Sequence, residues 1–244
     1  GVIVYVNASF SRISGYSAAD AIGHTQALVR VGETPGEVFA DMSRTLADGR
    51  TWRGEVSGRR KAGDRYWEDM TVLDERGRAT HYIAVSEDVT ARKQAKRREQ
   101  QRSRILEAIA SGSLPLPEVL GMIVAMAEAE LPESTCSIQR LNAESRTLHN
   151  ACPTRLPAAW LETIEGASIG ADAGSCGTAA HTGKRAVVED IATHPFWQAW
   201  RDEALRHGLR ACWSQPVLSS SGGVLGTLAV YYARPQAPAS DEIR

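Results

Sequence analysis

The stretch "VSEDVTARKQAKRREQ", residues 85–100, constrains the fold most, because it changes character at its middle. Up to Val89 it is typical of the end of a strand. From Thr90 onward nearly every residue is a good helix former and most are charged, which is typical of a solvated helix rather than of a buried one. We therefore expect two domains joined by a linker helix, with boundaries at residues 1–90, 91–104 and 105–244.

Composition narrows the class of protein. Of the 244 residues, 43% are hydrophobic and 23% charged, as in ordinary globular proteins, and the formal net charge is -1. This balance argues against nucleic acid or a membrane surface as a partner. No apolar run approaches the roughly 20 residues that span a bilayer, and no signal peptide is visible. The four cysteines lack framework or metal-site spacing and indicate reduced thiols in a cytoplasmic protein: Cys136, Cys152, Cys176 and Cys212.

The first half has the pattern of a small α+β domain. "VIVYV" predicts a strand, and Ser17 with Asp20 predicts a capping box at the start of a short helix. Apolar residues at helical spacing over 34–50 predict a one-sided helix. Three strand-like segments follow, at residues 51–60, 64–74 and 80–89. Helices followed by antiparallel strands predict one sheet with helices packed on a face.

The second half predicts another α+β domain. A helix is expected over "PEVLGMIVAMAEAELP", and shorter ones over "PAAWLETIEG" and "PFWQAWRDEALRHG". Strands are expected over "STCSIQRLN", "TLHNAC", "KRAVVEDI", "RACWSQPVL" and "GVLGTLAVYYA". At the junction of the halves, Thr90 is expected to be the N-cap of the linker helix, with its hydroxyl accepting from the next turn.

The first half resembles a PAS domain. "IVYVNASFSRISGYSAADAIG" is similar to the opening of that family, and residues 51–93 are similar to its closing strands, the C-terminal PAC motif, with the Asp-x-Thr that begins a signalling helix. Members normally have a strand before "VIVYV" that pairs centrally in the sheet. The resemblance thus implies that this first strand is missing and that the pocket is partly open.

The second half resembles a GAF domain. "GSCGTAA", "VVEDI", "GLRACWSQPV" and "GVLGTLAVYY" carry the resemblance, which is to GAF domains found beside PAS domains in cyclic-di-GMP enzymes and sensor kinases. GAF domains usually close with a helix. Because "PASDEIR" has only the beginning of one, the resemblance implies a truncated C-terminal helix.

The PAS resemblance implies a pocket in which Asn7, Trp52 and Glu55 are candidate cofactor-binding residues. Non-covalent flavin remains open, with Trp52 packing on the ligand and Glu55 bonding its polar edge. The alternative is that Trp52 only packs the start of its strand. Light-driven cysteinyl chemistry is excluded, because the segment "GHTQAL" has no cysteine where that chemistry needs one. Haem is disfavoured, because the helix expected over the pocket has no histidine for a proximal ligand.

In the GAF half, Cys176, Cys212 and Trp213 are candidate ligand-binding or redox residues. Cys176 lies at the start of a predicted helix, which favours thiolate character, and Cys212 lies on a later strand that could approach it. The alternative is that both cysteines are small buried core residues. A small apolar or aromatic ligand is a hypothesis under a lid of aromatic residues. Five aromatics are expected to form the core and this lid: Trp160, Phe196, Trp197, Trp200 and Trp213. No metal site is expected.

Together these features predict a sensory segment of a bacterial signalling protein rather than an enzyme, since no catalytic constellation is visible. We expect a small ligand or redox change to be relayed through the linker helix, in a homodimer paired along it, to an output domain later in the chain. Cyclic-di-GMP turnover by GGDEF or EAL domains is the favoured output, and a histidine kinase is the alternative. An alternative of another class is a GAF-type free methionine sulfoxide reductase that uses Cys176.

Overall fold

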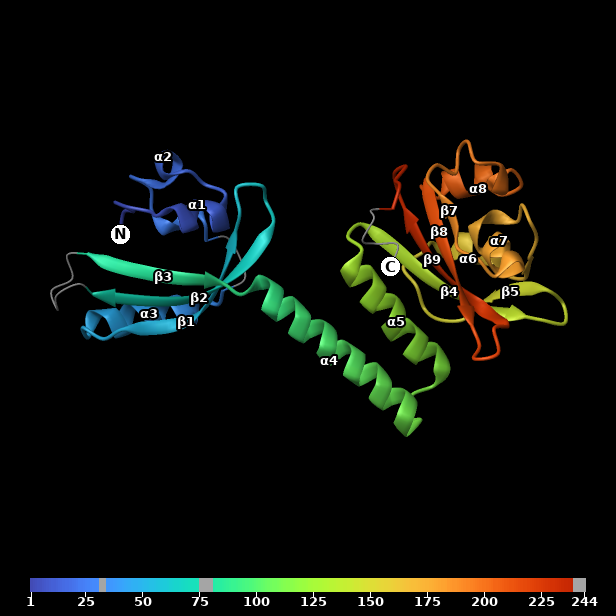
Figure 1. The fold of residues 1–244 in the computed structure, drawn as a ribbon, viewed down its shortest axis with the longest axis horizontal. Coiled ribbons are helices and arrows are strands. Elements are labelled where there is room, and N and C mark those ends of the chain that lie inside the picture. The colour runs from blue at the N-terminus through green and yellow to red at the C-terminus, as the bar shows by residue number, and fades with distance from the viewer. Residues whose placement is uncertain (31–33, 75–80, 239–244) are drawn as a thin grey trace. The chain divides into compact units, whose positions relative to one another are not determined.

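The computed structural model describes residues 1–30, 34–74 and 81–238. The chain forms two compact units, Gly1–Gln100 and Gln101–Arg244. Each has an antiparallel sheet with flanking helices, as the α+β prediction requires (Figure 1). The expected closing helix at "PASDEIR" lies almost entirely outside the described residues. Among the described helices, none combines the length and the apolar character that crossing a membrane requires.

The first unit begins with helices and ends with a sheet. Four short helices precede the strands: α1 (Ala8–Ser14), α2 (Ala18–Ala21), the 3-10 helix η1 (Gln26–Leu28) and α3 (Gly36–Ala47). The predicted capping box of Ser17 and Asp20 begins α2 and is confirmed. The sheet has the antiparallel order β1 (Trp52–Arg59), β2 (Arg65–Asp74), β3 (Tyr82–Asp88). The apolar side chains that were predicted to line one side of α3 pack on one face of the sheet. Together with residues of β1 and β2 they form the core of this unit: Val38, Phe39, Met42, Leu46, Trp52, Val56, Met70 and Val72.

The strand predicted at "VIVYV" does not form, which corrects that expectation. Val2 makes one isolated bridge with Thr25, and the backbone of Ile3 bonds His24 and Gly23 at 2.8 and 2.9 Å. A strand needs a neighbour for the rest of its N–H and C=O groups, and no described strand lies beside residues 4–7. Tyr5 accordingly remains 77% exposed.

The joint between sheet and helix differs from the expectation for Thr90. Helix α4 covers Thr90–Ser111, so it is longer than the expected linker 91–104 and includes Ile105, which lies in the second unit as expected. Thr90 is its first residue, and the Thr90 hydroxyl accepts from the Trp67 backbone N–H of β2 at 2.8 Å. The carboxylate of Asp88 bonds the Thr90 N–H at 2.9 Å and the hydroxyl at 2.5 Å. The carboxylate of Asp88, not the Thr90 hydroxyl, therefore satisfies the free donor at the start of the helix.

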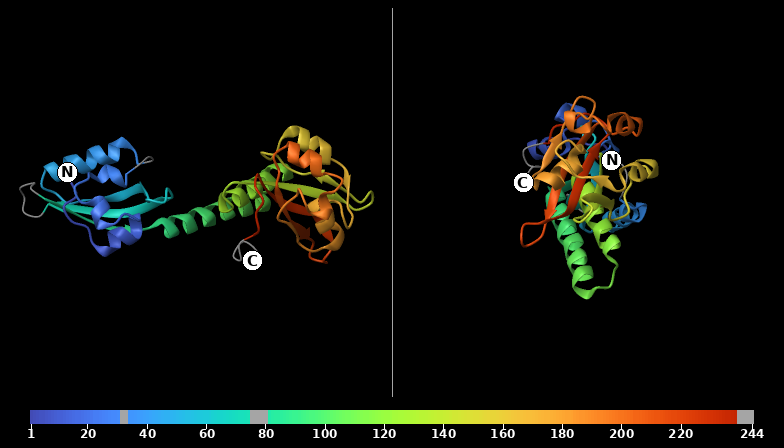
Figure 2. Two further views of the ribbon diagram at one scale, coloured as in Figure 1. Left: turned by 90° about the horizontal axis from the view of Figure 1, so that it is seen from above. Right: turned by 90° about the vertical axis from the view of Figure 1, so that its right-hand side faces the viewer.

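The second unit is a six-stranded antiparallel sheet covered by helices on both faces (Figures 1 and 2). The order is β6 (Ala167–Ser168), β5 (Thr147–Asn150), β4 (Ser134–Asn142), β9 (Val224–Tyr232), β8 (Ala211–Leu218), β7 (Ala186–Val188). Helix α5 (Leu116–Glu130) packs on one face. Four further elements lie on the other face: α6 (Ala158–Ile164), α7 (Gly174–Thr182), the 3-10 helix η2 (Pro195–Trp197) and α8 (Arg201–Arg206).

The helix predicted over "PFWQAWRDEALRHG" is divided into η2 and α8. Trp197 turns its side chain into the core, where its Nε1 donates to Ser175 Oγ at 3.1 Å, and it is 3% exposed. Anchoring this indole under α7 fixes the chain before α8 begins, so the two pieces are not continuous. The break places Trp200 between them, at the edge of the site described next.

Candidate ligand-binding site

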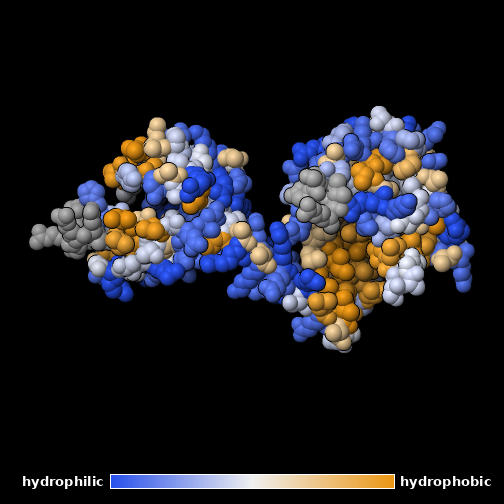
Figure 3. Space-filling model, viewed as in Figure 1, coloured by the Kyte–Doolittle hydropathy of each residue, from blue (hydrophilic) through white to orange (hydrophobic). Residues whose placement is uncertain are grey.

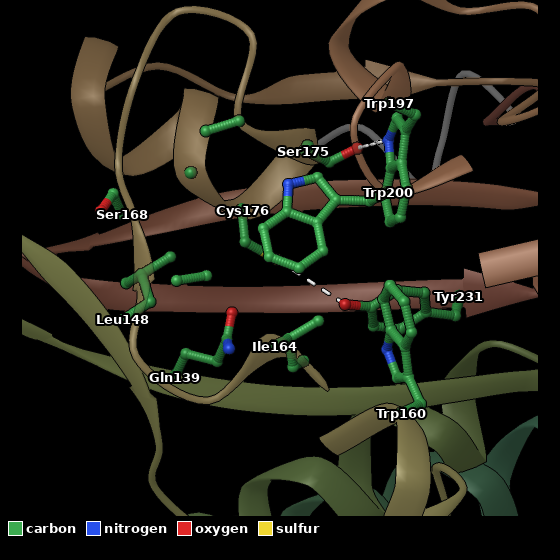
Figure 4. A pocket seen from close by; sticks show the side chains of 14 residues that line it. Gln139, Leu148, Trp160, Ile164, Ser168, Ser175, Cys176, Trp197, Trp200 and Tyr231 are labelled. Carbon is green, nitrogen blue, oxygen red and sulfur yellow. Dashed lines mark hydrogen bonds between the residues drawn. The ribbon is translucent and has the colours of Figure 1, made fainter. Parts of the chain in front are cut away.

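A cavity of about 30 Å³ lies between the sheet of the second unit and helices α6 and α7 (Figure 4). Its walls come from segments far apart in sequence. Strands β4, β5 and β9 contribute Gln139, Leu148 and Tyr231, whereas α6 and α7 contribute Trp160 and Cys176. Trp197 and the half-buried Trp200 close the remaining side. Three tryptophans and one tyrosine thus form part of the cavity wall.

The aromatic wall is fixed by packing and hydrogen bonds. The rings of Trp160 and Trp197 stack with centroids 6.0 Å apart and planes at 19°. Ser175 accepts from Trp197 Nε1 and donates its own hydroxyl hydrogen to the carbonyl of Cys212 at 2.9 Å. Ser175 therefore joins η2 to β8, and α7 has no side-chain cap at its start. This arrangement holds one side of the cavity rigid.

Two buried polar groups face the cavity. The amide of Gln139 points into it in Figure 4, although the residue is only 2% exposed. Trp160 is 1% exposed, and its Nε1 has no hydrogen-bond partner among the residues that the structure describes. The Trp160 N–H is close enough to the Tyr231 hydroxyl to lower the pKa of Tyr231. The two groups are nevertheless not placed for a hydrogen bond. An unpaired buried N–H is costly, so this donor is available to a ligand.

Cys176 brings a thiol to the same cavity. Its Sγ lies 3.8 Å from the Tyr231 hydroxyl, and the Cys212 thiol is close enough to affect its pKa. The hydrogen bond from Cys212 lowers the pKa of Cys176 to about 7, against the effect of burial, which raises it. Burial raises the pKa of Cys212 and of Tyr231, so both stay protonated. Cys212 and Tyr231 are directly paired across β8 and β9, and Cys176 contacts the Tyr231 hydroxyl. The structure thus brings Cys176 and Cys212 together, as predicted.

Trp213 does not join this group. It follows Cys212 on β8, and successive side chains of a strand point to opposite faces. Its ring packs on Tyr232 with centroids 4.9 Å apart, in the core beneath α5, and its Nε1 donates to the carbonyl of Gln236 at 3.3 Å. Trp213 is therefore a packing residue of the opposite face.

Sequence reasoning missed Gln139 and Tyr231 as cavity residues. The sequence carries no clear signal for Gln139, because most residues of β4 (STCSIQRLN) are polar, although the strand is buried from Cys136 to Gln139. Which aromatics line the cavity and which only pack could not be read from the sequence, since that depends on how the segment 195–206 breaks.

A second, open pocket of about 300 Å³ is lined by Asp172, Pro195, Gln198 and Ala199. Asp172 precedes Ala173, and Ala199 precedes Trp200, so both lining segments continue into the walls of the inner cavity. Only the outer pocket carries a charged side chain, Asp172. We describe it as the outer pocket.

In the first unit the three predicted pocket residues are not brought together. Asn7 is exposed and serves as the N-cap of α1, accepting from the Phe10 N–H at 3.0 Å. Trp52 is 5% exposed, and its Nε1 donates to Asp41 Oδ2 of α3 at 3.0 Å. Glu55 lies on the other face of β1, where its carboxylate is 2.5 Å from Lys93 Nζ of α4.

The interior face of this sheet is covered by the chain's own rings. The Trp52 indole lies over Gly54, where an added Cβ would be 2.5 Å from the ring. The Tyr66 ring lies over Gly58, at 2.7 Å from such a Cβ, and Tyr66 is 1% exposed. As arranged, these residues do not fit a flavin, because both rings would have to leave before a flat cofactor could lie there.

The first unit also buries a charge that sequence reasoning did not single out as buried. Burial raises the pKa of Glu68, which bonds Tyr66, and burial lowers the pKa of Arg30 nearby. Arg30 donates to Met70 Sδ at 3.1 Å and lies 5.1 Å from the centroid of Phe39.

Over the ranges 1–30, 34–74 and 81–238, no group of three or more His, Cys, Asp or Glu side chains is placed to hold a metal ion.

Comparison with known proteins identifies the families of the two units. Residues 1–91 match the PAS domain family and residues 113–244 match the GAF domain family. The chain is 36% identical over 211 residues to a methyl sulfide methyltransferase-associated sensor of Methanosarcina acetivorans, covering 84% of this chain and 21% of that protein. It is 30% identical over 110 residues to a nitrogen fixation regulatory protein of Klebsiella oxytoca, covering 44% of this chain and 22% of the relative.

Among solved structures, the GAF domain of a phosphoenolpyruvate-protein phosphotransferase from Coxiella burnetii is similar, with 17% identity and a TM-score of 0.47. The match covers 61% of this chain and 82% of that structure. The chain thus spans about a fifth of the length of the relatives named above.

Proposed function

Because this chain belongs to the PAS and GAF families, a PAS domain followed by a GAF domain, we propose that it is the sensory input segment of a cytoplasmic signalling protein. The observation that carries the proposal is the Trp-walled cavity of the GAF domain, with the polar groups of Gln139 and Trp160 facing it. A mainly apolar cavity with few polar groups is the usual form of a small-molecule site. The ligand acts by favouring one packing of the domain over another.

Helix α4 is the element through which such a bias would pass. It is one continuous helix over Thr90–Ser111, fixed to the PAS sheet at Thr90 and packed within the GAF unit through Ile105 and Ala108. The ion pair of Lys93 with Glu55 fastens its first turn, and the Lys93 ammonium also lies 4.0 Å from the Trp67 ring centroid.

We further propose that two copies pair along this helix. Figure 3 shows apolar side chains gathered over α5, and the end of α4 beside it leaves Leu106 and Ile109 55% and 58% exposed. These residues are three apart and so share one face of the helix. A paired helix of this kind would pass a bias to both copies.

The output domain is proposed from the family resemblance alone. Cyclic-di-GMP turnover is favoured, with a sensor histidine kinase as the alternative. The coding sequence beyond Arg244 distinguishes them: a GGDEF or EAL motif supports the first, and a histidine-bearing helix followed by an ATP-binding domain supports the second. A sulfoxide reductase would need Cys176 to turn over, so methionine sulfoxide consumption abolished by Cys176→Ser would replace the sensory proposal.

Insertions in α4 test the relay in the full-length protein. Two residues inserted after Lys96 rotate the following helix by about 200°, whereas seven restore its phase closely. We expect the two-residue insertion to abolish regulation of the output and the seven-residue insertion to preserve it, with both domains folded. Normal regulation with both insertions would contradict a relay through this helix.

A further inference from the structure

The lining of the GAF cavity restricts the charge of what it can bind. The lining includes Gln139, Leu148, Trp160, Ser175, Cys176 and Tyr231, and it contains no Lys, Arg, His, Asp or Glu. Below the Cys176 pKa of about 7, where this thiol is protonated, an ion moved into such a cavity loses its hydration and meets no counter-ion. Phosphates, carboxylates and nucleotides are therefore poor occupants.

The aromatic walls do not by themselves favour a cation. Rings attract cations through their faces, but the faces of Trp160 and Trp197 are stacked on each other. The group that Trp160 has free is its Nε1–H, which is a donor only and would repel a cation. The acidic side chain of Asp172, which precedes the lining residue Ala173, lines the outer pocket instead.

The free donor has a specific requirement. A buried N–H recovers its lost hydration only when an acceptor atom reaches it. The Gln139 amide, which faces the same cavity, can donate to the same acceptor or accept from a ligand. The Tyr231 hydroxyl remains protonated, but it already contacts Cys176 Sγ at 3.8 Å. The Trp160 and Gln139 donors, at a mainly apolar cavity, match one strong acceptor oxygen.

The volume restricts the size. At about 30 Å³ the cavity takes a water-sized group as it stands, compared with about 150 Å³ for a cavity that holds benzene. Trp160 and Trp197 are fixed, but Trp200 is half-buried and carries no bond that anchors it in the manner of Trp197. Displacing Trp200 toward the outer pocket is the least costly way to admit a few more atoms.

From the free Trp160 donor, the uncharged lining and the small volume, we infer that the GAF cavity selects a neutral molecule of about four heavy atoms with one hydrogen-bond-accepting oxygen. This rests on the proposed sensory function and adds the class of ligand. The oxygen lies against Trp160 Nε1, and the apolar part lies against Leu148, Ile164 and the displaced Trp200.

Four planar molecules of the same shape test this class in the whole chain: acetone, 2-methylpropene, acetamidinium and acetate. Affinities are measured from the indole N–H resonances of ¹H–¹⁵N spectra. We expect acetone to bind and to shift the Trp160 indole N–H, with the two ions not binding. 2-methylpropene is more hydrophobic than acetone, so the two affinities are not compared directly. The affinity of acetone relative to that of 2-methylpropene is instead compared between the wild type and variants.

Trp160→Phe removes the donor and keeps a ring, so the affinity of acetone relative to 2-methylpropene should fall about ten-fold, as expected when a buried hydrogen bond is lost. Trp197→Phe is the matched control, because that N–H already bonds Ser175, and it should leave the ratio unchanged. If Trp160→Phe does not fold, the wild type provides the test: acetone should shift the Trp160 indole N–H resonance and 2-methylpropene should not, and equal shifts would overturn the ligand class.

Tighter binding of acetamidinium or acetate, or an unchanged ratio in Trp160→Phe, would overturn the ligand class while leaving a binding cavity in place. Binding of none of the four would overturn the class and count against the sensory cavity itself.

Discussion

The hydroxyl of Thr90 accepts a hydrogen bond from the backbone N–H of Trp67 at 2.8 Å, so the first residue of α4 is bonded directly to the middle strand of the PAS sheet. Thr90 also donates its hydroxyl hydrogen to Asp88, whose other oxygen lies 2.6 Å from Arg60. Arg60 in turn lies 4.8 Å from the centroid of the buried Tyr66 ring. The start of the helix is thus connected through polar contacts to the interior of the PAS domain.

Replacing Thr90 tests this connection. Thr90→Val keeps the shape but leaves the Trp67 N–H without an acceptor, so the PAS unit should lose about 1 kcal/mol of stability in urea unfolding. Thr90→Ser keeps the hydroxyl and should remain within a few tenths of the wild type. Equal losses in the two variants would show that the methyl packing, not the hydrogen bond, is what matters.

The buried Glu68 predicts a pH dependence of the PAS unit. Burial raises the pKa of Glu68 in the folded protein. Below the unfolded pKa the side chain is protonated in both states and costs the fold nothing. As the pH rises from there through the folded pKa, the free energy of unfolding falls, because ionisation is easier in the unfolded chain. Glu68→Gln cannot ionise. Measured by urea unfolding, its stability should therefore improve relative to the wild type as the pH rises above about 4.3, the unfolded value. A difference between the two proteins that stays constant with pH would contradict this.

Cys176 should be the thiolate of the chain. Its pKa of about 7 depends first on the hydrogen bond from Cys212, whereas burial raises the pKa of Cys136 and Cys152. The rate of its modification by a small methanethiosulfonate should rise with pH around neutrality, as followed by mass spectrometry of the labelled peptides.

The dependence on Cys212 supplies the control for that experiment. Cys212→Ala removes the donor and should move the profile to higher pH, whereas Cys212→Ser retains a donor and should move it less. Equal profiles in the wild type and Cys212→Ala would mean that another group sets the reactivity of Cys176.

Gly226 holds two strands of the GAF sheet together. A Cβ there would lie 2.1 Å from the backbone oxygen of Gln139, so Gly226→Ala must displace β4 and should cost about 1–3 kcal/mol. In helix α5, Gly121→Ala meets only Pro153 Cδ at 3.8 Å and should stabilise by about 0.5–1 kcal/mol. Thermal unfolding of the two variants, expected to shift in opposite directions, is the measurement.

Much of the fold could be predicted from the sequence because local signals agreed with the packing. Ser17 and Asp20 cap α2 as predicted, and the apolar stripe of α3 meets the sheet. Two predictions that depended on a distant partner were wrong. "VIVYV" has the residues of a strand but no described neighbour for most of its length, and Thr90 bonds Trp67, a residue 23 positions away.

The candidate site was predicted less completely, for the same physical reason. Cys176 and Cys212 were correctly singled out as neighbours across the fold, but Trp213, one residue further along β8, faces the other core. Gln139 looks like an ordinary strand residue until β4 is placed beneath α6 and α7. A cavity belongs to several segments at once, so only the tertiary arrangement reveals which side chains share it.

The claim that the GAF cavity is a binding site is tested most directly by thermal unfolding with a panel of neutral, cationic and anionic small molecules. Two variants accompany the wild type: Ala167→Leu, which fills the cavity wall, and Ala125→Leu, at an exposed position of α5. The account predicts that at least one neutral molecule raises the Tm of the wild type and of Ala125→Leu but not of Ala167→Leu. No rise with any molecule, or the same rise in Ala167→Leu, would contradict it.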